Sequence, residues 1–283
     1  MNIRQVRKKI RSVTNVKKIT KAMELVSAIK MKKAQQLAIE ARPYQQNLES
    51  IINKITAKID PRLSPLLQTS DDQNKKKLAI IISTNKGLCG SFNFNLFHFL
   101  INNCQTTDTD FITVGKKASF FINKIGGNIL ADFSQNLAME NVSAIFQFVL
   151  NSFLEKKYQQ ILIFYQQFIS TLKSQPTKEI LLPIKYQPVD QSVLKKKEEE
   201  YLIEPSPQEI IDDLLKSFLE TKIINAIIQS EAAEHSARMI AMKNATDNAN
   251  EVINELISLR NKVRQEKITY ELLDMMTATT LVS

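Results

Sequence analysis

Glycine and proline are confined to the middle of this 283-residue chain. All five glycines lie between Gly87 and Gly127, and proline is absent from residues 1–42 and 208–283. These two residue types interrupt helices most often. The distribution therefore predicts a long helix at each end of the chain. It excludes collagen-like, linker-rich and turn-dense all-β classes.

The N-terminal segment, Ile3 to about Ile59, has apolar side chains at spacings of three and four, which predicts a helix with a narrow coiled-coil stripe. Pro43 is expected to kink this helix, because it removes one backbone N–H. At 1.5 Å per residue the helix would be roughly 80 Å long and could not bury its stripe alone. The stripe comprises Ile3, Val6, Ile10, Val13, Val16, Ile19, Met23 and Val26, then Leu37, Ala41, Tyr44, Leu48, Ile51 and Ile55.

The C-terminal segment predicts a second and longer helix, from Ile210 to about Thr280, with Ser206 as a candidate N-cap between Pro205 and Pro207. Seventy helical residues would span about 105 Å, which is too long for a compact domain of this size. The simplest arrangement is an antiparallel coiled coil between the two chain ends. Because the C-terminal helix is longer, part of it should project unpaired or be held by another protein.

The middle of the chain, residues 75–190, alternates strand and helix patterns and predicts a small α/β, Rossmann-like domain with a mostly parallel sheet. The fold class is therefore mixed, with a long helical coiled coil plus this side domain. The expected divisions are 1–60, 75–190 and 205–283. Strands are expected at 78–83, 111–114, 161–168 and 180–184, and helices at 94–103, 116–125 and 142–158.

The net charge of +9 is concentrated at one end of the chain. Residues 1–33 carry eleven basic groups and one acid, whereas the remaining 250 residues are nearly neutral. Such a helix could be a targeting sequence, bind nucleic acid or an anionic membrane, or run as a shaft through a polar sleeve. Cleavage of a targeting sequence would remove the partner of the C-terminal helix. The other two alternatives stay open on pattern alone.

A search for catalytic constellations yields no candidate catalytic residue, cofactor site or metal site. Asn85–Ser91 follows the first strand, but it lacks the spacing of a phosphate-binding P-loop, so a tight turn explains its glycines. The two cysteines and two histidines, Cys89, Cys104, His98 and His235, do not form a zinc pattern. The acidic pairs Asp71-Asp72, Asp108/Asp110 and Asp212-Asp213 are expected on the solvated surface. No apolar run is long enough to span a bilayer.

Three separated motifs closely resemble the gamma subunit of F-type ATP synthases. They are Ile10–Ala28 at the N-terminus, Asn85–Asn93 after the first strand, and a C-terminal set formed by Ser230–Ala249, Asn261–Gln265 and Ile268–Leu272. Their order matches the family, and from the first motif to the last they span almost the whole chain. The resemblance implies a non-catalytic central rotor shaft. Its rotation would couple proton flow through the membrane sector to ATP synthesis or hydrolysis in the alpha–beta ring.

The resemblance also implies partner contacts at particular residues. Arg264, Gln265, Thr269 and Glu271 match positions that touch beta-subunit catch loops, and Met23 and Arg238 match positions tied to coupling efficiency. The small, uncharged tip Thr277–Ser283 suits a slippery bearing. Residues Tyr201, Glu204 and Pro205 match the foot that meets the epsilon subunit and the membrane c-ring.

The implied partners are therefore the alpha, beta and epsilon subunits and the c-ring, without nucleic acid and without direct membrane insertion. The implied location is peripheral, at the cytoplasmic face of a bacterial inner membrane. The chain is expected to be bacterial, because family-like sequence begins almost at once. The alternative function is a basic coiled-coil module that binds nucleic acid or an anionic membrane surface.

Overall fold

The computed structural model describes residues 2–56, 64–68, 76–184, 204 and 206–280. It divides into two compact units. Unit 1 joins residues 1–28 and 238–283, and unit 2 comprises residues 29–237. The elements, in chain order, are α1 (Ile3–Thr56), β1 (Lys77–Ile82), α2 (Phe92–Asn103), β2 (Thr109–Val114), α3 (Lys116–Lys124), β3 (Asn128–Asp132), the 3-10 helix η2 (Ala138–Asn141), α4 (Val142–Leu154), β4 (Gln160–Ser170), β5 (Lys173–Leu182) and α5 (Pro207–Thr280).

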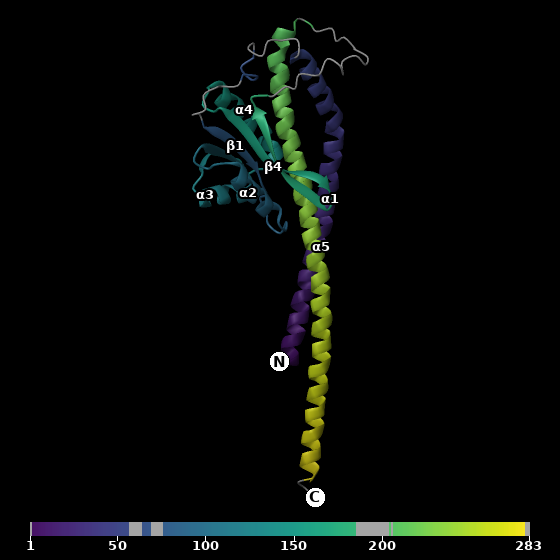
Figure 1. Cartoon of the computed structure of the whole chain (residues 1–283). Coiled ribbons are helices and arrows are strands. Elements are labelled where there is room, and N and C mark those ends of the chain that lie inside the picture. Colours follow the sequence, from purple (N-terminus) through teal and green to yellow (C-terminus); the bar gives the residue numbers. More distant parts are fainter. Residues whose placement is uncertain (1, 57–63, 69–75, 185–203, 205, 281–283) are drawn as a thin grey trace. The chain divides into compact units, whose positions relative to one another are not determined.

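Unit 2 contains a five-stranded sheet in the order β3-β2-β1-β4-β5. Strands β1 to β4 are parallel, and β5 pairs antiparallel with β4 in a long hairpin (Figure 1). The mostly parallel sheet predicted from the sequence is confirmed. Pro176 lies in β5, the edge strand, where its missing N–H leaves no gap between paired strands.

The sheet of unit 2 is covered on both faces, because successive residues of β1 point in opposite directions. Leu78, Ile80 and Ile82 pack with α4 and with segments of α1 and α5. Ala79 and Ile81 pack with α2 and α3. A central strand buried on both faces is what the unbroken apolar run in β1 indicates.

The structure changes three details of the predicted side domain. Strand β3 was not anticipated, because its five residues alternate exposed and half-buried side chains and lack an apolar run. Helix α4 ends at Leu154, short of the expected Tyr158, because the chain turns at Lys156 with a φ of 54°. Strand β5 begins at Lys173, seven residues before the expected start, because most of it is a polar, partly exposed edge.

The two terminal helices form as predicted. Helix α1 continues through Pro43 and ends at Thr56 among the described residues. Helix α5 begins at Pro207, and Ser206 caps it by accepting a hydrogen bond from the Glu209 backbone N–H at 3.3 Å. In unit 2 the segments of α1 and α5 are antiparallel, since Lys30 acts on Glu231 while Ile55 shares a core with Ile211.

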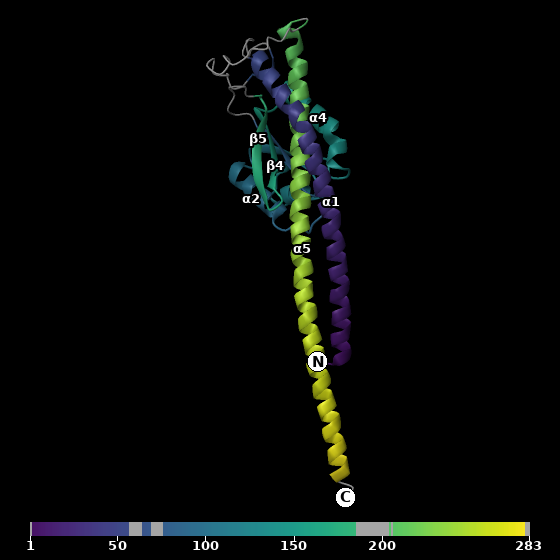
Figure 2. The same ribbon diagram turned by 90° about the vertical axis from the view of Figure 1, so that its right-hand side faces the viewer.

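In unit 1 the end segments of α1 and α5 lie side by side in both views (Figures 1 and 2). We call the buried line of contact between these two segments the seam. It differs from the predicted stripe, because Val16, Ile19 and Val26 are half or more exposed, whereas Thr20 and Ser27 are buried. A straight helix has 3.6 residues per turn, so a stripe that repeats every 3.5 residues drifts around it. Small polar side chains instead let the two helices approach closely.

No described helix of the chain is long and apolar enough to cross a lipid bilayer.

Candidate partner interface

The buried contacts of unit 1 set the geometry of the predicted interface. The Thr20 and Thr246 hydroxyl oxygens lie 2.8 Å apart across the seam, and each also contacts a carbonyl of its own helix. The two hydroxyl protons are therefore shared among three possible hydrogen bonds, one between the hydroxyls and one from each hydroxyl to a backbone carbonyl. Val6, Met242 and Ala249 supply the buried apolar groups in the described part of this unit. The pairing relies on close approach of small side chains more than on apolar area.

Two predicted coupling residues lie on the paired part of these helices. Met23 is half-buried on α1. Arg238, on α5, is only 7% exposed. A guanidinium so deeply placed can present little surface to another protein, whereas part of Met23 remains accessible. The structure thus separates two residues that the sequence placed in one class.

The four predicted catch-loop residues lie toward the other end of α5, where the side chains from Arg264 to Met276 are all exposed. The Thr269 hydroxyl donates to the backbone oxygen of Gln265 at 2.9 Å. The Lys267 ammonium lies 3.3 Å from the Glu271 carboxylate, one turn away. Both interactions stay within one helix and are exposed to solvent, so they can be exchanged for contacts with a partner at little cost.

Apolar side chains are also exposed along this part of α5. They include Ile268, Tyr270, Leu272, Leu273, Met275 and Met276. Within this chain the run is left uncovered, which agrees with the expectation that part of α5 projects unpaired or is held by another protein. Exposed apolar side chains gathered in this way are typical of surfaces that contact another molecule.

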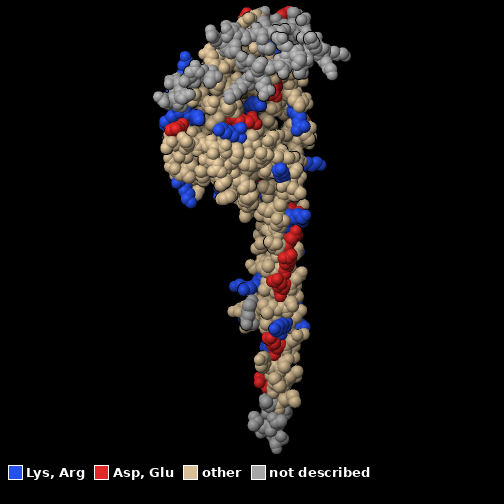
Figure 3. Space-filling model, in the orientation of Figure 1, with Lys and Arg blue, Asp and Glu red and all other residues tan. Residues whose placement is uncertain are grey.

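Acidic side chains follow α5 between the seam and this exposed run. Asp247, Glu251 and Glu255 are four residues apart and exposed. Figure 3 shows acidic side chains in a row along the helix. Spacing of four residues places them on one face, where they repel one another and favour a basic partner surface.

The predicted foot is only partly described. Tyr201 and Pro205 lie outside the described residues. Glu204 is exposed.

Polar side chains in and beside the Asn85–Ser91 loop make hydrogen bonds within the chain. The Asn93 amide donates to the Thr84 hydroxyl at 2.9 Å, and the Asn85 side chain accepts from the Lys116 backbone N–H at 3.0 Å. Leu88 and Gly90 have φ values of 63° and 59°. A left-handed conformation is an outlier for a bulky residue such as Leu88. The loop is built as a tight structural turn, as predicted from its glycines.

The acidic pairs serve structural contacts where they are described. Asp110 is 6% exposed and accepts hydrogen bonds from Tyr158 at 2.8 Å and Asn128 at 2.9 Å, with Lys76 3.3 Å away. Burial acts to raise the pKa of Asp110, but the hydrogen bonds and the Lys76 charge outweigh it and the net pKa is lowered. The expectation that this pair is solvated is wrong for Asp110. The cluster ties the amino ends of the parallel strands together.

Other candidate chemistry on the chain is dispersed. Asp212 accepts a hydrogen bond from Ser64 at 2.5 Å, and Asp213 pairs with Lys216 at 2.9 Å. Asp71 and Asp72 lie outside the described residues. Across the described ranges, no three His, Cys, Asp or Glu side chains are grouped so that they could hold a metal ion.

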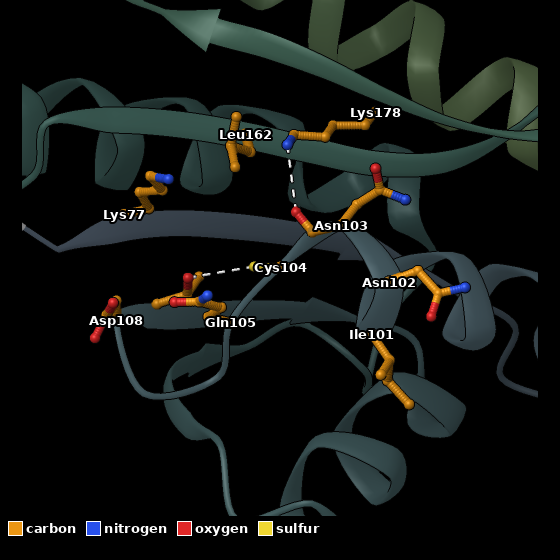
Figure 4. Close-up of a pocket in the computed structure, with 10 residues that line it drawn as sticks. Lys77, Ile101, Asn102, Asn103, Cys104, Gln105, Asp108, Leu162 and Lys178 are labelled. Carbon is orange, nitrogen blue, oxygen red and sulfur yellow. Dashed lines mark hydrogen bonds between the residues drawn. The ribbon is translucent and has the colours of Figure 1, made fainter.

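A pocket of about 610 Å³ opens beside the end of α2 and the starts of β1 and β2 (Figure 4). The Lys178 ammonium donates to the Asn103 backbone oxygen at 3.3 Å, and the Cys104 thiol lies 3.2 Å from the Thr109 hydroxyl. Lys77 and Gln105 line it as exposed side chains. None of the predicted partner residues within the described ranges lines this pocket.

The fold defines a class of protein: two long helices, antiparallel where they pair in unit 2, together with a mostly parallel α/β domain and a run of exposed apolar side chains on the second helix. The ATP synthase family model matches residues 2–280. The chain belongs to the ATP synthase gamma-subunit family.

Solved structures show the same fold at low sequence identity. The rotor of Euglena gracilis mitochondrial ATP synthase in rotational state 1 is 19% identical, with a TM-score of 0.67 over 94% of this chain and 98% of that one. A chain from its OSCP/F1/c-ring assembly in rotational state 3 is 20% identical, with a TM-score of 0.70 over 99% and 94%. A chain of the Tetrahymena thermophila mitochondrial central stalk and c-ring is 23% identical, with a TM-score of 0.56 over 80% and 99%.

The sequence missed the buried hydroxyls of the seam. Thr20 and Ser27 are seven residues apart and lie between apolar positions, which places them on one helix face. That spacing was a usable signal. A stripe defined by apolar residues alone leaves out the small polar residues that allow close approach.

Proposed function

We propose that this chain is the central rotor shaft of an F-type ATP synthase, a non-catalytic subunit that couples proton flow through the membrane sector to ATP synthesis or hydrolysis. The match of the family model over residues 2–280 carries this proposal. It favours the rotor over a basic coiled-coil module that binds nucleic acid or anionic membrane.

The partners we propose are the alpha–beta ring, the epsilon subunit and the membrane c-ring. The structures that share the fold are described as a rotor, as part of an OSCP/F1/c-ring assembly and as a central stalk with a c-ring. We place the chain at the cytoplasmic face of a bacterial inner membrane, as a peripheral protein. Residues 1–60 and 205–283 would form the shaft and residues 75–190 the side domain.

The bearing surface of such a rotor must contact its ring without binding it tightly. The exposed part of α5 suits this need, since Thr269 and Glu271 are engaged only in exposed contacts within the helix. Arg264 and Gln265 are exposed on the same stretch. These four residues would exchange their present contacts for directional hydrogen bonds with beta-subunit catch loops at particular angles of rotation.

The coupling residues would act in different ways. Met23 is half-buried, and the neighbouring Ile19 and Val26 are exposed on α1, so this face is available to the ring. Arg238 is buried and would act by fixing the seam. Tyr201, Glu204 and Pro205 remain our proposed foot, which would meet the epsilon subunit and the c-ring.

The decisive experiment is affinity purification of the tagged full chain from membranes. The rotor predicts recovery of alpha and beta subunits, and ATP hydrolysis coupled to proton movement only when this chain is present. Recovery of neither subunit would contradict it. Salt-sensitive binding to DNA or anionic vesicles that persists after removal of the last thirty residues would favour the basic module instead.

Replacing Met23 with lysine sharpens the test. We expect the ratio of proton transport to ATP hydrolysis to fall about two- to five-fold, because a new cation can form one stray ion pair with the ring. Assembly should be unchanged. The matched control is Ile39→Lys, which adds the same charge to an exposed site on the same helix. Equal effects of the two changes would argue against a specific role for Met23.

A further inference from the structure

The sheet of unit 2 has a topological switch point between β1 and β4. From β1 the chain continues to β2 and β3 on one side, and it later returns to β4 on the other side. In open α/β sheets, ligands bind in the crevice beyond the carboxyl ends of the two strands that flank such a point. Here that crevice is filled by the protein's own residues.

Helix α5 supplies one wall of the filling. Cys89 and Phe92, which follow β1, are 3% and 2% exposed and form an apolar cluster with Ala233 of α5. Phe168 of β4 and Ala237 of α5 pack against this cluster. Alanine at positions 233 and 237 keeps α5 slim where the loop and the strand approach it. At this contact α5 contributes two alanines, and the side domain contributes Phe92 and Phe168.

Strand β4 fastens the same junction with polar contacts. It runs past Phe164, the last residue that it pairs with β1, and continues with β5 beside α5 (Figures 1 and 2). The Gln166 amide, 1% exposed, donates to the Phe92 backbone oxygen at 3.0 Å. The Phe168 backbone N–H donates to the Gln229 side chain at 3.3 Å, and the Ser236 hydroxyl donates to the Thr171 backbone oxygen.

A second contact joins the hairpin to α5 farther along the helix. The Tyr165 phenol donates to the Glu179 carboxylate, and the Lys222 ammonium lies 3.9 Å from that carboxylate.

Leu88 is held in a left-handed conformation just before Cys89. Backbone strain of this kind persists only where the surroundings over-determine it. Here the strained turn directs Cys89 inward and leaves Leu88 62% exposed.

We infer that the switch-point crevice is a socket for α5. Ser236 is the positioning residue that holds the β4–β5 hairpin on this helix, and Gln166 is the positioning residue that holds Phe92 in the facing wall. The socket occupies the place where a doubly wound domain would take a ligand. Its role in a rotating shaft rests on the proposed function, because a rotor must carry its side domain without slip. The socket itself is a property of the chain alone.

The two native thiols provide the test. Cys89 is buried in the socket, and Cys104 is half-buried outside it and serves as an internal reference. Alkylation by N-ethylmaleimide, followed by mass spectrometry of the intact and digested full chain, gives the ratio of the Cys89 rate to the Cys104 rate. Opening of the socket raises the Cys89 rate and leaves the Cys104 rate unchanged, whereas unfolding of the whole unit raises the Cys104 rate as well.

Two variants and two matched controls decide the outcome. Gln166→Met and Ser236→Ala should each raise the ratio about five-fold, the factor that one lost neutral hydrogen bond gives. Gln167→Met, the exposed neighbour on β4, and Ser217→Ala, exposed on α5, should leave it within about two-fold. An unchanged ratio in both test variants, or a parallel rise at Cys104, would overturn the socket. Because the isolated chain is used, failure of the rotor function leaves this result readable.

Discussion

The two compact units differ in the kinds of side chain that each one buries. In the described part of unit 1, the buried apolar residues are Val6, Met242 and Ala249, and the buried polar residues are Thr20, Ser27, Arg238 and Thr246. Unit 2 buries both faces of a sheet under helices in two large apolar clusters. Buried apolar area is the main source of folding free energy, so unit 2 can stand alone far better than unit 1.

The difference shows that a packed apolar core stabilises unit 2, whereas a thin line of specific contacts is enough to pair the helices of unit 1. A thin seam of small and polar side chains fixes the register of two helices through specific contacts, and it leaves apolar side chains on their outer faces for a partner. A packed core resists every displacement. We therefore expect substitutions in unit 2 to change the free energy of unfolding most, and those in unit 1 to change local opening.

The largest effect is expected from Ile223→Ala. Ile223 is fully buried in the core of unit 2, so the change should lower the free energy of unfolding by about 2–5 kcal/mol through lost burial and a cavity. Urea unfolding followed by circular dichroism measures it. Ile268→Ala, on the same helix but 48% exposed, is the control and should change stability by less than about 0.5 kcal/mol. Similar losses would break the contrast between the units.

Asp110→Asn should come next. At pH 7 we expect a loss of about 1.5–3 kcal/mol, because hydrogen bonds to a buried carboxylate are removed or weakened. The folded pKa of Asp110 is lowered, so its contribution is complete above the ordinary value of about 3.9 and is lost as pH falls through the folded pKa. The difference in free energy of unfolding between the parent and the variant should therefore disappear in acid. Asp108→Asn, exposed two residues earlier, should show no such difference.

Thr246→Val tests the seam of unit 1. We expect a loss of about 1 kcal/mol in local stability, measured as faster hydrogen exchange of unit 1 amides. Since two protons serve three contacts, the double change Thr20→Val and Thr246→Val should cost less than the sum of the single changes. Strict additivity would show that the two hydroxyls do not interact. Thr269→Val, an exposed site with one contact inside α5, is the control.

The smallest effect is expected from Glu231→Gln. Burial and the neighbouring Glu234 raise the pKa of Glu231, while Lys30 on α1 acts in the opposite direction. Stability associated with the protonated form is complete below the unfolded pKa and is lost as pH rises through the folded pKa. The variant should therefore melt at a higher temperature than the parent at pH 7.5 and at the same temperature below pH 4. A gain in acid, or an equal gain in Glu266→Gln, would contradict this account.

Much of the fold could be predicted because it rests on local pattern. The glycine and proline distribution predicted both terminal helices, and the apolar run of β1 predicted a strand covered on both faces. Strand β3 and most of β5 could not be predicted, since edge strands are specified by their neighbours and their own residues alternate exposed and half-buried. The seam of unit 1 could not be predicted for a related reason, because several of its buried residues carry hydroxyl groups and apolar patterning does not detect them.

The interface could be predicted only as a set of residues. Sequence placed Met23 and Arg238 together as coupling positions, and burial separates them into one accessible and one enclosed side chain. It placed Thr269 and Glu271 on the exposed helix, and the structure adds the contacts that each must exchange. Exposure and hydrogen-bond partners depend on what packs against a residue, and spacing along one helix does not contain that information.

The sequence by itself determined the helices at both ends, the parallel α/β domain between them and, through three motifs, the family. Each of these follows from signals a few residues long that act locally or appear as contiguous strings. Only the tertiary structure decided that hydroxyls occupy the seam, that Asp110 is enclosed by Tyr158 and Asn128, and that α5 fills the switch-point crevice of the sheet. These features join residues more than fifteen positions apart, so packing alone brings them together.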